Sequence, residues 1–357
     1  MMQVMQTAWG NPASIHQWGE RSSMVVERAR EQLADLLNTH PDRLIFTSGG
    51  TESNNMAIWG IARTYASPQH LITTTIEHSA VALPIDYLEQ NGWQVTRLGV
   101  DRWGVVSASD LVNALRPNTV LVSIIYAHNE VGTIQAISEL GDICRSAGVL
   151  LHTDAVQAVG RIPIDLATQP IDLLSLSGHK FYAPQGIGAL YIGSRVKQFA
   201  PLLLGGGQEQ GYRSGSVPVA LIAGLGTAAA LAKAEMAEET ERLQTLRNYF
   251  LQQMHTLPQF HATGHPTQRL PNHLSFIHES WKGRDIVYKL NRSHIAISSG
   301  SACSSGKTVP SASLLAMGYS SESATRGIRL TMGRSTTTAD LQETIDRLRE
   351  ITTGAHG

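Results

Sequence analysis

The chain is poor in cysteine. Its 357 residues include only two, Cys144 and Cys303. Two cysteines cannot build the several disulfides of a small secreted domain, nor a zinc site made of four thiolates. The cysteine content therefore fits a reducing compartment, and we expect the protein to be cytoplasmic.

The chain also lacks an excess of charge of either sign. Its 28 lysines and arginines balance 29 aspartates and glutamates, for a formal net charge of -1. Without a strongly basic surface, the protein has no general attraction for nucleic acid or an anionic membrane. The N-terminal residues MMQVMQTAWGNP lack the basic and apolar regions of a signal peptide. We therefore expect small-molecule or protein partners, with no direct nucleic-acid or membrane partner.

One long apolar stretch, SGSVPVALIAGLGTAAALA at 214–232, contains no charged residue. It approaches the length of a membrane-spanning helix. Its proline, repeated glycines and many alanines make it weakly apolar, so we interpret it as a loop followed by a buried helix. A membrane span is the less favoured alternative.

The hydrophobic pattern predicts two domains, since a chain of this length exceeds one small core. Apolar runs alternate with helical patterns in the order RLIFTS, helix from Thr51, HLITTTI, helix from Ser79, TVLVSIIYA, helix near 137–147, GVLLHTDA. Such alternation indicates successive βαβ units, and the lack of strict apolar-polar alternation indicates a largely parallel sheet buried on both faces.

Beyond this region, IDLLSLSG precedes a return strand, GIGALYIGS, and a charged helix follows near 233–254. The runs HLSFI, HIAISS and GIRLTMG, separated by helices near 284–290 and 340–349, indicate a compact α+β domain. We therefore predict an α/β protein with a large domain over 1–235 and a smaller α+β domain over 236–357.

Polar residues follow directly after the expected strands. They are Gly49 to Glu52, Glu77 with His78, His128 to Glu130, Asp154 with Gln157, and His179 with Lys180. Ligands of open α/β sheets bind outside the carboxyl ends of the strands, so these residues are expected to share one crevice.

Each of these residues has an ordinary structural alternative. Gly49 to Thr51 could hold a phosphate at a helix N-terminus, but an ordinary turn capped by Thr51 fits equally well. Asp154 could cap a helix, and His78 could be a hydrogen-bonded structural histidine. Lys180 is harder to explain in this way, because a lysine at an interior strand end is costly unless it is paired or chemically used.

The two cysteines differ in their surroundings. Cys144 lies in a helical pattern, ELGDICRSAG, and is expected to be a small buried residue. Cys303 lies in SSGSACSSGK, where no large apolar neighbour exists to bury it, so we expect a reactive thiol on a loop. Arg326, Arg329 and Arg334 surround an apolar strand, where an arginine favours either a carboxylate ligand or a structural ion pair.

A lysine, an acid and a phosphate cradle together indicate pyridoxal 5'-phosphate. This cofactor needs a lysine for its aldehyde, an acid for its ring nitrogen and an anion site for its phosphate. Lys180 and Asp154 would supply the first two. Thr51, Ser177 and His179 would supply the third.

The motifs LIFTSGGTESNNMAI, HSAV, AHNEVGTIQ, HTDAVQAVG, SLSGHKFYAPQGIGALY, GGGQEQGYRSGS and SSGSACSSG occur in this order. Together they resemble the cysteine desulfurases of the NifS-like and IscS-like class, a branch of the fold-type I pyridoxal-phosphate enzymes and of the class V aminotransferase family. The resemblance runs from about Gly10 to Thr337.

The resemblance implies a role for each matching residue. Lys180 would hold the cofactor as a Schiff base, Asp154 would pair with its ring nitrogen and His78 would stack on its ring. The remaining cofactor contacts would come from Gly50, Thr51, Asn129, Gln157, Ser177 and His179, and from Ser216, which would reach the cofactor of the other subunit of a homodimer. Asn129 and Arg329 would bind the substrate, and Cys303 would accept its sulfur.

The reaction implied is conversion of L-cysteine to L-alanine with a persulfide on Cys303, and Lys180 or His78 would move the protons. An iron-sulfur scaffold or another acceptor protein would then collect the sulfur. Relatives normally begin with a segment of the D-N-N-A-T-T kind that this chain lacks. The alternatives are therefore a selenocysteine or cystine lyase, a small-substrate aminotransferase, or a non-catalytic assembly protein. A nicotinamide dehydrogenase is disfavoured, because no G-x-G-x-x-G opens the first βα unit.

Overall fold

The computed structural model describes the backbone of residues 1–300, 303–304 and 307–353. It describes the side chains of residues 1–300 and 309–352. It divides into two compact units. The first contains Met1–Leu98, Ala108–Tyr126 and Ala136–Met236, and the second contains Gly99–Ser107, Ala127–Gln135 and Ala237–Gly357. The short segments 99–107 and 127–135 thus belong with the second unit, which the hydrophobic pattern did not indicate.

The first unit is built on a seven-stranded sheet with the order β1-β7-β6-β5-β4-β2-β3. The strands are β1 (Leu44–Thr47), β2 (His70–Thr74), β3 (Gln94–Leu98), β4 (Thr119–Ser123), β5 (Leu150–Asp154), β6 (Leu173–Ser177) and β7 (Gly188–Ile192). Neighbours from β3 to β6 pair in parallel, whereas β7 is antiparallel to both β6 and β1. All strands except β7 therefore point the same way, which confirms the predicted, mostly parallel sheet.

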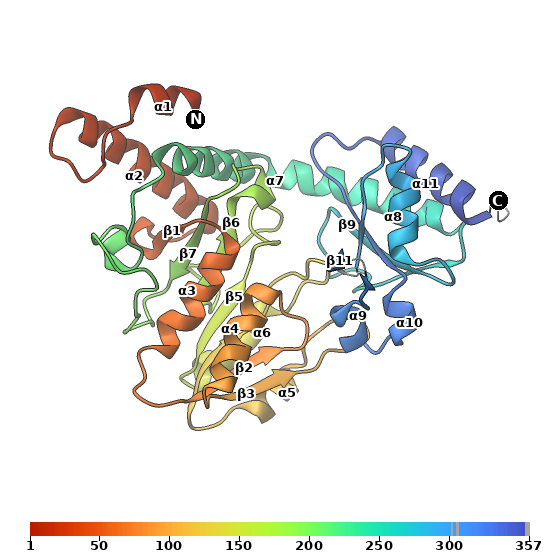
Figure 1. Cartoon of the computed structure of the whole chain (residues 1–357), viewed down its shortest axis with the longest axis horizontal. Helices are drawn as coiled ribbons and strands as arrows, with labels where there is room; N and C mark the ends of the chain where they lie inside the picture. The colour runs from red at the N-terminus through yellow and green to blue at the C-terminus, as the bar shows by residue number, and fades with distance from the viewer. Residues whose placement is uncertain (301–302, 305–306, 354–357) are drawn as a thin grey trace. The chain divides into compact units, whose positions relative to one another are not determined.

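Helices cover this sheet (Figure 1). They are α1 (Met2–Thr7), α2 (Gln17–Leu37), α3 (Gly50–Ala62), α4 (Ser79–Gln90), α5 (Ala108–Ala114), α6 (Ile137–Ser146) and the first half of α7 (Val219–Met254). Helices α3 and α4 share a buried core with the strands, in which Ile58, Val81 and Leu121 are 0–1% exposed. This core fixes the start of both helices at the edge of the sheet.

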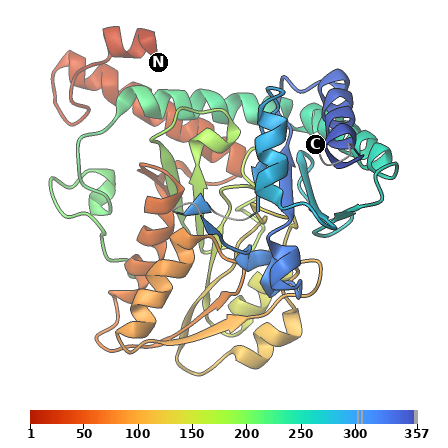
Figure 2. The ribbon, with the colours of Figure 1, turned by 45° about the vertical axis from the view of Figure 1, so that its right-hand side comes forward.

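Helix α7 is a single helix of 36 residues, whereas the sequence predicted a loop with a short Ala-rich helix and a separate charged helix. The prediction was wrong about the break because alanine and the charged residues that follow all favour helix. By length and hydropathy alone, α7 could cross a membrane. However, Ile222, Leu225 and Ala229 are fully buried, and a Cβ on Gly226 would lie 2.5 Å from the Ala29 Cα of α2. Helices α2 and α7 lie side by side (Figure 2), so α7 is a core helix.

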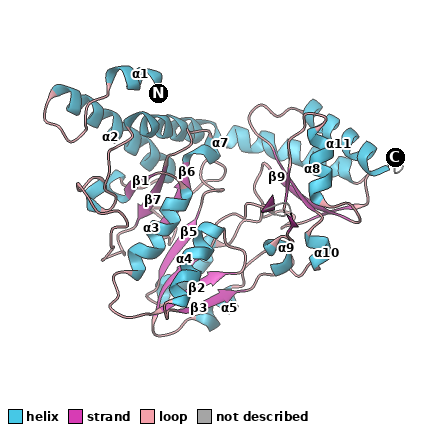
Figure 3. Ribbon diagram, viewed as in Figure 1, coloured by secondary structure: helices cyan, strands magenta, loops and turns pink. Residues whose placement is uncertain are grey.

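The second unit contains a four-stranded antiparallel sheet with the order β10-β13-β9-β8. Its elements are β8 (Phe260–Ala262), β9 (His273–His278), α8 (Gly283–Asn291), β10 (Ser298–Ser299), β11 (Cys303–Ser304), β12 (Lys307–Thr308), α9 (Ala312–Ala316), α10 (Ser321–Ala324), β13 (Gly327–Thr331) and α11 (Thr338–Thr353). Figure 3 shows β9 beside the helices of this unit. Phe250, Phe276 and Ile345 form part of its core, which is the expected α+β arrangement.

Candidate active site

The predicted polar residues of the first unit lie at the carboxyl ends of its parallel strands, which we call the edge of the sheet. Strands β1, β2, β5 and β6 run in the same direction, so the residues that follow them emerge on the same side. These residues are Gly49 to Thr51, His78, Asp154, Gln157 and Ser177 to Lys180. The strand ends that the sequence indicated thus lie on the same side of this sheet, and the site that they would form stays a prediction.

Asp154 ends the central strand β5 and is only 4% exposed. Its Oδ2 accepts a hydrogen bond from Asn54 Nδ2 at 2.7 Å, and its Oδ1 accepts one from the Val156 N–H at 3.0 Å. Burial raises the pKa of Asp154, and these two hydrogen bonds and the charges of His78 and Lys180 oppose that rise. A carboxylate in this setting calls for a cationic partner.

The start of helix α3 forms a cradle next to Asp154. Gly49 has φ of +147°, which favours glycine, and α3 begins at Gly50. A Cβ on Gly50 would lie 2.6 Å from Val156 Cγ2, so only glycine lets the helix start approach the turn after β5. The first N–H groups of a helix lack intrahelical acceptors and attract anions. Thr51 is exposed beside them.

Strand β6 brings Ser177 and Lys180 to the same edge. The 3₁₀ helix Gly178–Phe181 follows β6 directly, and Ser177 Oγ lies 3.0 Å from His179 Nδ1. Ser177 is buried, His179 is exposed and Lys180 is half-buried. Burial and the neighbouring charge of Lys180 lower the pKa of His179. Lys180 is thus less enclosed than the sequence suggested, because the turn carries it outward from the strand.

His78 follows strand β2 and caps helix α4. Its Nδ1 accepts a hydrogen bond from the Ala80 N–H at 3.1 Å, which leaves Nε2 to carry the proton in the neutral ring. The imidazole itself is exposed at the sheet edge. The structural alternative for His78, a hydrogen-bonded cap, is therefore present, and it leaves the ring face and Nε2 available.

Glu77, next to His78, is a buried carboxyl group. Its Oε1 accepts hydrogen bonds from Thr74 Oγ1 at 2.8 Å and from the Ile125 N–H at 2.9 Å, which ties β2 to the segment after β4. Its Oε2 is buried without a hydrogen-bond partner. Burial raises the pKa of Glu77 to about 8, and the charge of Asp154 adds to the rise.

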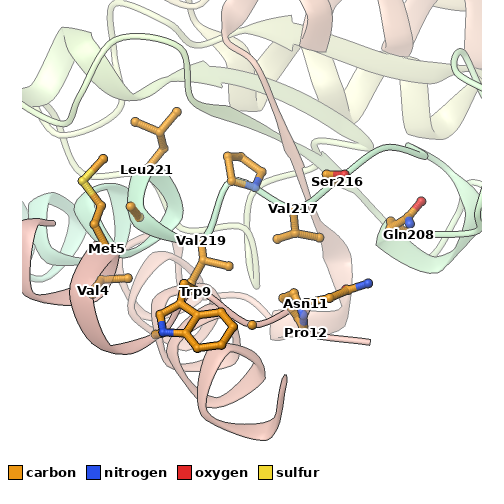
Figure 4. Close-up of a pocket in the computed structure, with 14 residues that line it drawn as sticks. Val4, Met5, Trp9, Asn11, Pro12, Gln208, Ser216, Val217, Val219 and Leu221 are labelled. Atoms are coloured by element: carbon orange, nitrogen blue, oxygen red, sulfur yellow. The ribbon is translucent and has the colours of Figure 1, made fainter. Parts of the chain in front are cut away.

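Ser216 lines a separate cavity of about 600 Å³ in the first unit (Figure 4). Trp9 and Pro12 from the N-terminal segment and Val217 and Val219 line it as well. Ser216 itself is exposed.

Gln157 is half-buried in the turn after β5.

The loop before Ser216 is fixed by ion pairs that the sequence did not indicate. Arg213 binds Glu52 of α3 with an Nε–Oε1 distance of 2.7 Å. Arg30 binds Glu209 with an Nη2–Oε1 distance of 2.8 Å, and Glu209 also accepts from the Phe46 N–H of β1. Residues 209–213 are thus attached to β1 and to the first turn of α3. Arg30 and Glu209 lie 179 positions apart, so no local pattern could pair them.

Asn129 and Arg329 belong to the second unit. Arg329 Nη1 donates to the Asn129 backbone oxygen at 2.8 Å, and its Nη2 donates to Ser298 Oγ at 3.0 Å. Arg326 instead pairs with Glu322 and the Glu279 carbonyl, the structural alternative predicted for an arginine here. Arg334 is exposed.

The two cysteines stand differently in the structure. Cys144 is fully buried in α6, as expected, and burial raises its pKa to about 12. The Cys303 backbone lies in β11, which pairs with β12, while its side chain lies outside the described residues. Its reactivity therefore stays a prediction.

Comparison with known proteins places the chain in a family. The model of the aminotransferase class-V family matches residues 1–344. The cysteine desulfurase IscS of Dictyoglomus turgidum is 44% identical over 353 residues, which cover 98% of this chain and 89% of that protein. The IscS of Methanosarcina thermophila is also 44% identical, over 98% of this chain and 87% of its own length.

A solved NifS-like protein superposes with a TM-score of 0.92 at 33% identity, covering 99% of this chain and 94% of its own. The chain therefore belongs to the aminotransferase class-V family and, within it, to the NifS-like and IscS-like cysteine desulfurases.

Proposed function

We propose that the protein is a pyridoxal-phosphate-dependent cysteine desulfurase, which converts L-cysteine to L-alanine and retains the sulfur as a persulfide on Cys303. The observation that carries this proposal is the placement of Asp154, Lys180 and the start of α3 at one edge of the sheet. Relatives of this name that align with 98% of the chain support it.

The first unit fits the ring of pyridoxal phosphate. Asp154 is buried and accepts one hydrogen bond on each carboxylate oxygen. Among the described residues, neither of these two donors is a cationic group. A protonated ring nitrogen would supply that positive charge. Asn54 Oδ1, on the side chain that orients Asp154, is itself buried without a hydrogen-bond partner. Within this unit we assign Asp154 to the ring nitrogen, His78 to the ring face and Gln157 to a polar substituent of the ring.

The same unit fits the phosphate of the cofactor. The N-terminal turn of α3 at Gly50 and Thr51 offers N–H groups and a hydroxyl, and Ser177 and His179 offer a second hydroxyl and an imidazole. Gly188 pairs with Thr47 and with Ser177. Both groups of donors are thus attached to the same strand, β7.

Lys180 is the proposed covalent attachment point for the cofactor aldehyde. Its charge acts on Asp154, and its backbone oxygen accepts a hydrogen bond from Arg161 Nη2 at 3.0 Å, which holds the turn in place. When bound, pyridoxal phosphate supplies an electron sink for negative charge at the α-carbon of the substrate.

Lys180, rather than His78, is the proposed base. His78 Nδ1 is occupied as the acceptor for Ala80 and Nε2 carries the hydrogen, so the neutral ring has no free lone pair to take up the α-proton and can only donate a hydrogen bond from Nε2. Removing the α-proton therefore falls to the Lys180 amine. This assignment chooses between two alternatives that the sequence left open.

Arg329 is the proposed ligand of the substrate carboxylate. Asn129 and Ser298 fix the plane of its guanidinium through the two hydrogen bonds described above. Ser298 also lies opposite Arg329 in the pairing of β10 with β13. The proposed carboxylate ligand is therefore hydrogen-bonded to β10, the strand that leads to the Cys303 segment.

In the sulfur step the Cys303 thiolate and the substrate supply the two sulfur atoms, and the bound cofactor would accept the electron pair left on the substrate when the carbon-sulfur bond breaks. The thiolate attacks the sulfur of the substrate, a sulfur-sulfur bond forms as the carbon-sulfur bond breaks, and the carbon is protonated to give alanine. The solved structure of SspA, 34% identical over 93% of each chain with a TM-score of 0.80, is described as being in complex with cysteine. This supports L-cysteine as the substrate.

We further propose a homodimer in which Ser216 completes the site of the other subunit. The exposed apolar side chains Trp9, Ile15 and Leu204, at 67%, 96% and 86% exposure, support a protein contact over this part of the first unit. We also propose that an acceptor protein, such as an iron-sulfur scaffold, collects the sulfur and that the protein is cytoplasmic. The proposed domains are residues 1–235 and 236–357.

The test is to incubate the protein with pyridoxal phosphate and L-cysteine and to measure alanine together with persulfide on Cys303. We expect both products, and Cys303→Ala should abolish both. Cys144→Ala serves as the matched control, because Cys144 is buried in α6, and should leave both in place. Alanine formed without a persulfide would refute the desulfurase proposal while leaving the cofactor.

A further inference from the structure

Glu130, which the proposed mechanism does not use, is a partly buried acid in the segment 127–135 of the second unit. Its Oε1 is buried and makes no hydrogen bond among the described residues. A buried carboxyl oxygen without a hydrogen bond is costly, so the position of Oε1 calls for an explanation.

One neighbour of this oxygen is Gly300, the residue just before the Cys303 segment. A Cβ on Gly300 would lie 2.1 Å from Glu130 Oε1, a distance that real Cβ atoms do not reach. The Gly300 N–H donates to the Gly327 carbonyl at 3.1 Å, which holds the glycine beside the start of β13. The Glu130 carboxyl group therefore occupies the space that a side chain at position 300 would need, and a larger residue there would displace it.

The other neighbours are Ser311 and Ser313, which follow the Cys303 segment. Their hydroxyl groups oppose the rise of the Glu130 pKa that burial causes, as does the charge of Arg329. Ser311 caps helix α9 by accepting from the Leu314 N–H at 3.1 Å. The Glu130 carboxyl group thus contacts residues on both sides of the Cys303 segment.

The backbone of the same segment is held firmly. His128 is 1% exposed; its Nδ1 accepts from the Glu130 N–H at 3.1 Å, and its Nε2 lies 3.1 Å from Ser313 Oγ. The Asn129 carbonyl accepts from Arg329. Glu130 therefore projects from a fixed backbone, which is what a positioning group requires.

We propose that Glu130 is a positioning residue that joins Gly300 to Ser311 and Ser313 and so sets where the Cys303 segment begins and ends. The inference rests on the proposed sulfur transfer to Cys303. It assigns Glu130 a part in the sulfur-transfer step and none in binding the cofactor or L-cysteine.

The test compares Glu130→Ala, Glu130→Gln, Gly300→Ala and the double variant in the holoenzyme. A misplacement of about 1 Å costs on the order of 100-fold in rate, so Glu130→Ala and Gly300→Ala should slow persulfide formation by roughly 10- to 100-fold. The concentration of L-cysteine that produces half of the change in cofactor absorbance should be the same as in the wild type. Glu130→Gln, which can still accept from the serines, should retain more activity than Glu130→Ala.

The double variant separates positioning from general damage. Alanine at 130 removes the atom that a side chain at 300 would strike, so the double variant should be no slower than Glu130→Ala alone. Gly99→Ala, where a Cβ meets nothing within 4 Å, and Glu343→Gln, on the exposed face of α11, are the matched controls and should react at the wild-type rate.

Full rates in Glu130→Ala and Gly300→Ala, or slowing that multiplies in the double variant, would overturn the inference. Amide hydrogen exchange of 298–300 and 311–314 gives a readout that needs no activity. We expect faster exchange on both sides in Glu130→Ala, and unchanged exchange would also overturn it. Failure of the wild type to form alanine and persulfide would instead refute the proposed function, with the exchange result still deciding whether Glu130 joins the two sides.

Discussion

Replacing Glu77 by glutamine should change how the stability of the protein depends on pH. The folded state holds this carboxyl group with a pKa of about 8, against an ordinary value of 4.5. Between these pH values the folded protein binds one more proton than the unfolded chain, so stability falls as pH rises from 4.5 to about 8. At about 1.36 kcal/mol for each tenfold change in proton affinity, the whole loss is about 5 kcal/mol.

Glutamine cannot ionise, and its amide oxygen can still accept from Thr74 and Ile125. Relative to the wild type, Glu77→Gln should therefore gain about 3 kcal/mol of unfolding free energy between pH 6 and pH 9. Urea unfolding at both pH values measures this difference. Glu31→Gln, on the exposed face of α2, is the control and should track the wild type. If Glu77→Gln shows the same pH dependence as the wild type, Glu77 is ionised in the folded protein and the reasoning fails.

Three further predictions concern the cofactor. Borohydride reduction should fix pyridoxal phosphate to the wild type but not to Lys180→Ala, as mass spectrometry of the peptide will show. Asp154→Asn should weaken cofactor retention on dialysis by roughly 10-fold or more, since a hydrogen bond to a charged group contributes about 1.5–3 kcal/mol. Gly50→Ala should weaken binding of inorganic phosphate to the apoprotein, because the new Cβ would lie 2.6 Å from Val156; unchanged phosphate affinity would contradict the cradle.

The sheet of the first unit was predictable because each strand is a short, apolar run followed by a polar residue. The runs before Gly49, His78 and Asp154 all became strands that end where expected. The parallel direction followed from the helices between them, and the shared edge followed from the direction. Strand β3, with Arg97 in QVTRL, was missed because it lies at the sheet edge and is only partly buried.

The second unit was less predictable, because its strands are short or depend on distant pairing. The run HIAISS became only Ser298–Ser299, since its earlier residues follow α8 without a partner strand. The segments 99–107 and 127–135 join this unit through contacts such as Gln135 Nε2 with the Gly104 carbonyl at 2.6 Å. No periodicity records a contact of this kind.

Within the site, the sequence indicated residue types but not their partners. Asn54 lies in a helix 100 positions before Asp154, and its role as a hydrogen-bond donor became visible only in the fold. Glu77 was singled out as a residue after a strand, yet nothing in its neighbours shows that its carboxyl group turns inward. The direction of a polar side chain at a strand end depends on which N–H groups the adjacent strands leave available.

The buried neighbours of Asp154 explain why a bound cation matters there. His152 lies on the same face of β5, two residues earlier, with Nδ1 2.8 Å from Ser123 Oγ and Nε2 3.0 Å from Ser175 Oγ. Burial lowers the pKa of His152 to about 3, so it stays neutral and gives Asp154 no positive charge. The protonated form favoured for Glu77 keeps a second negative charge away from the same place. Among these groups, only Lys180 and His78 bring positive charge that lowers the pKa of Asp154. A cationic group bound at the carboxyl ends of the strands would favour its ionised form further, which is what a partner of a pyridinium nitrogen requires.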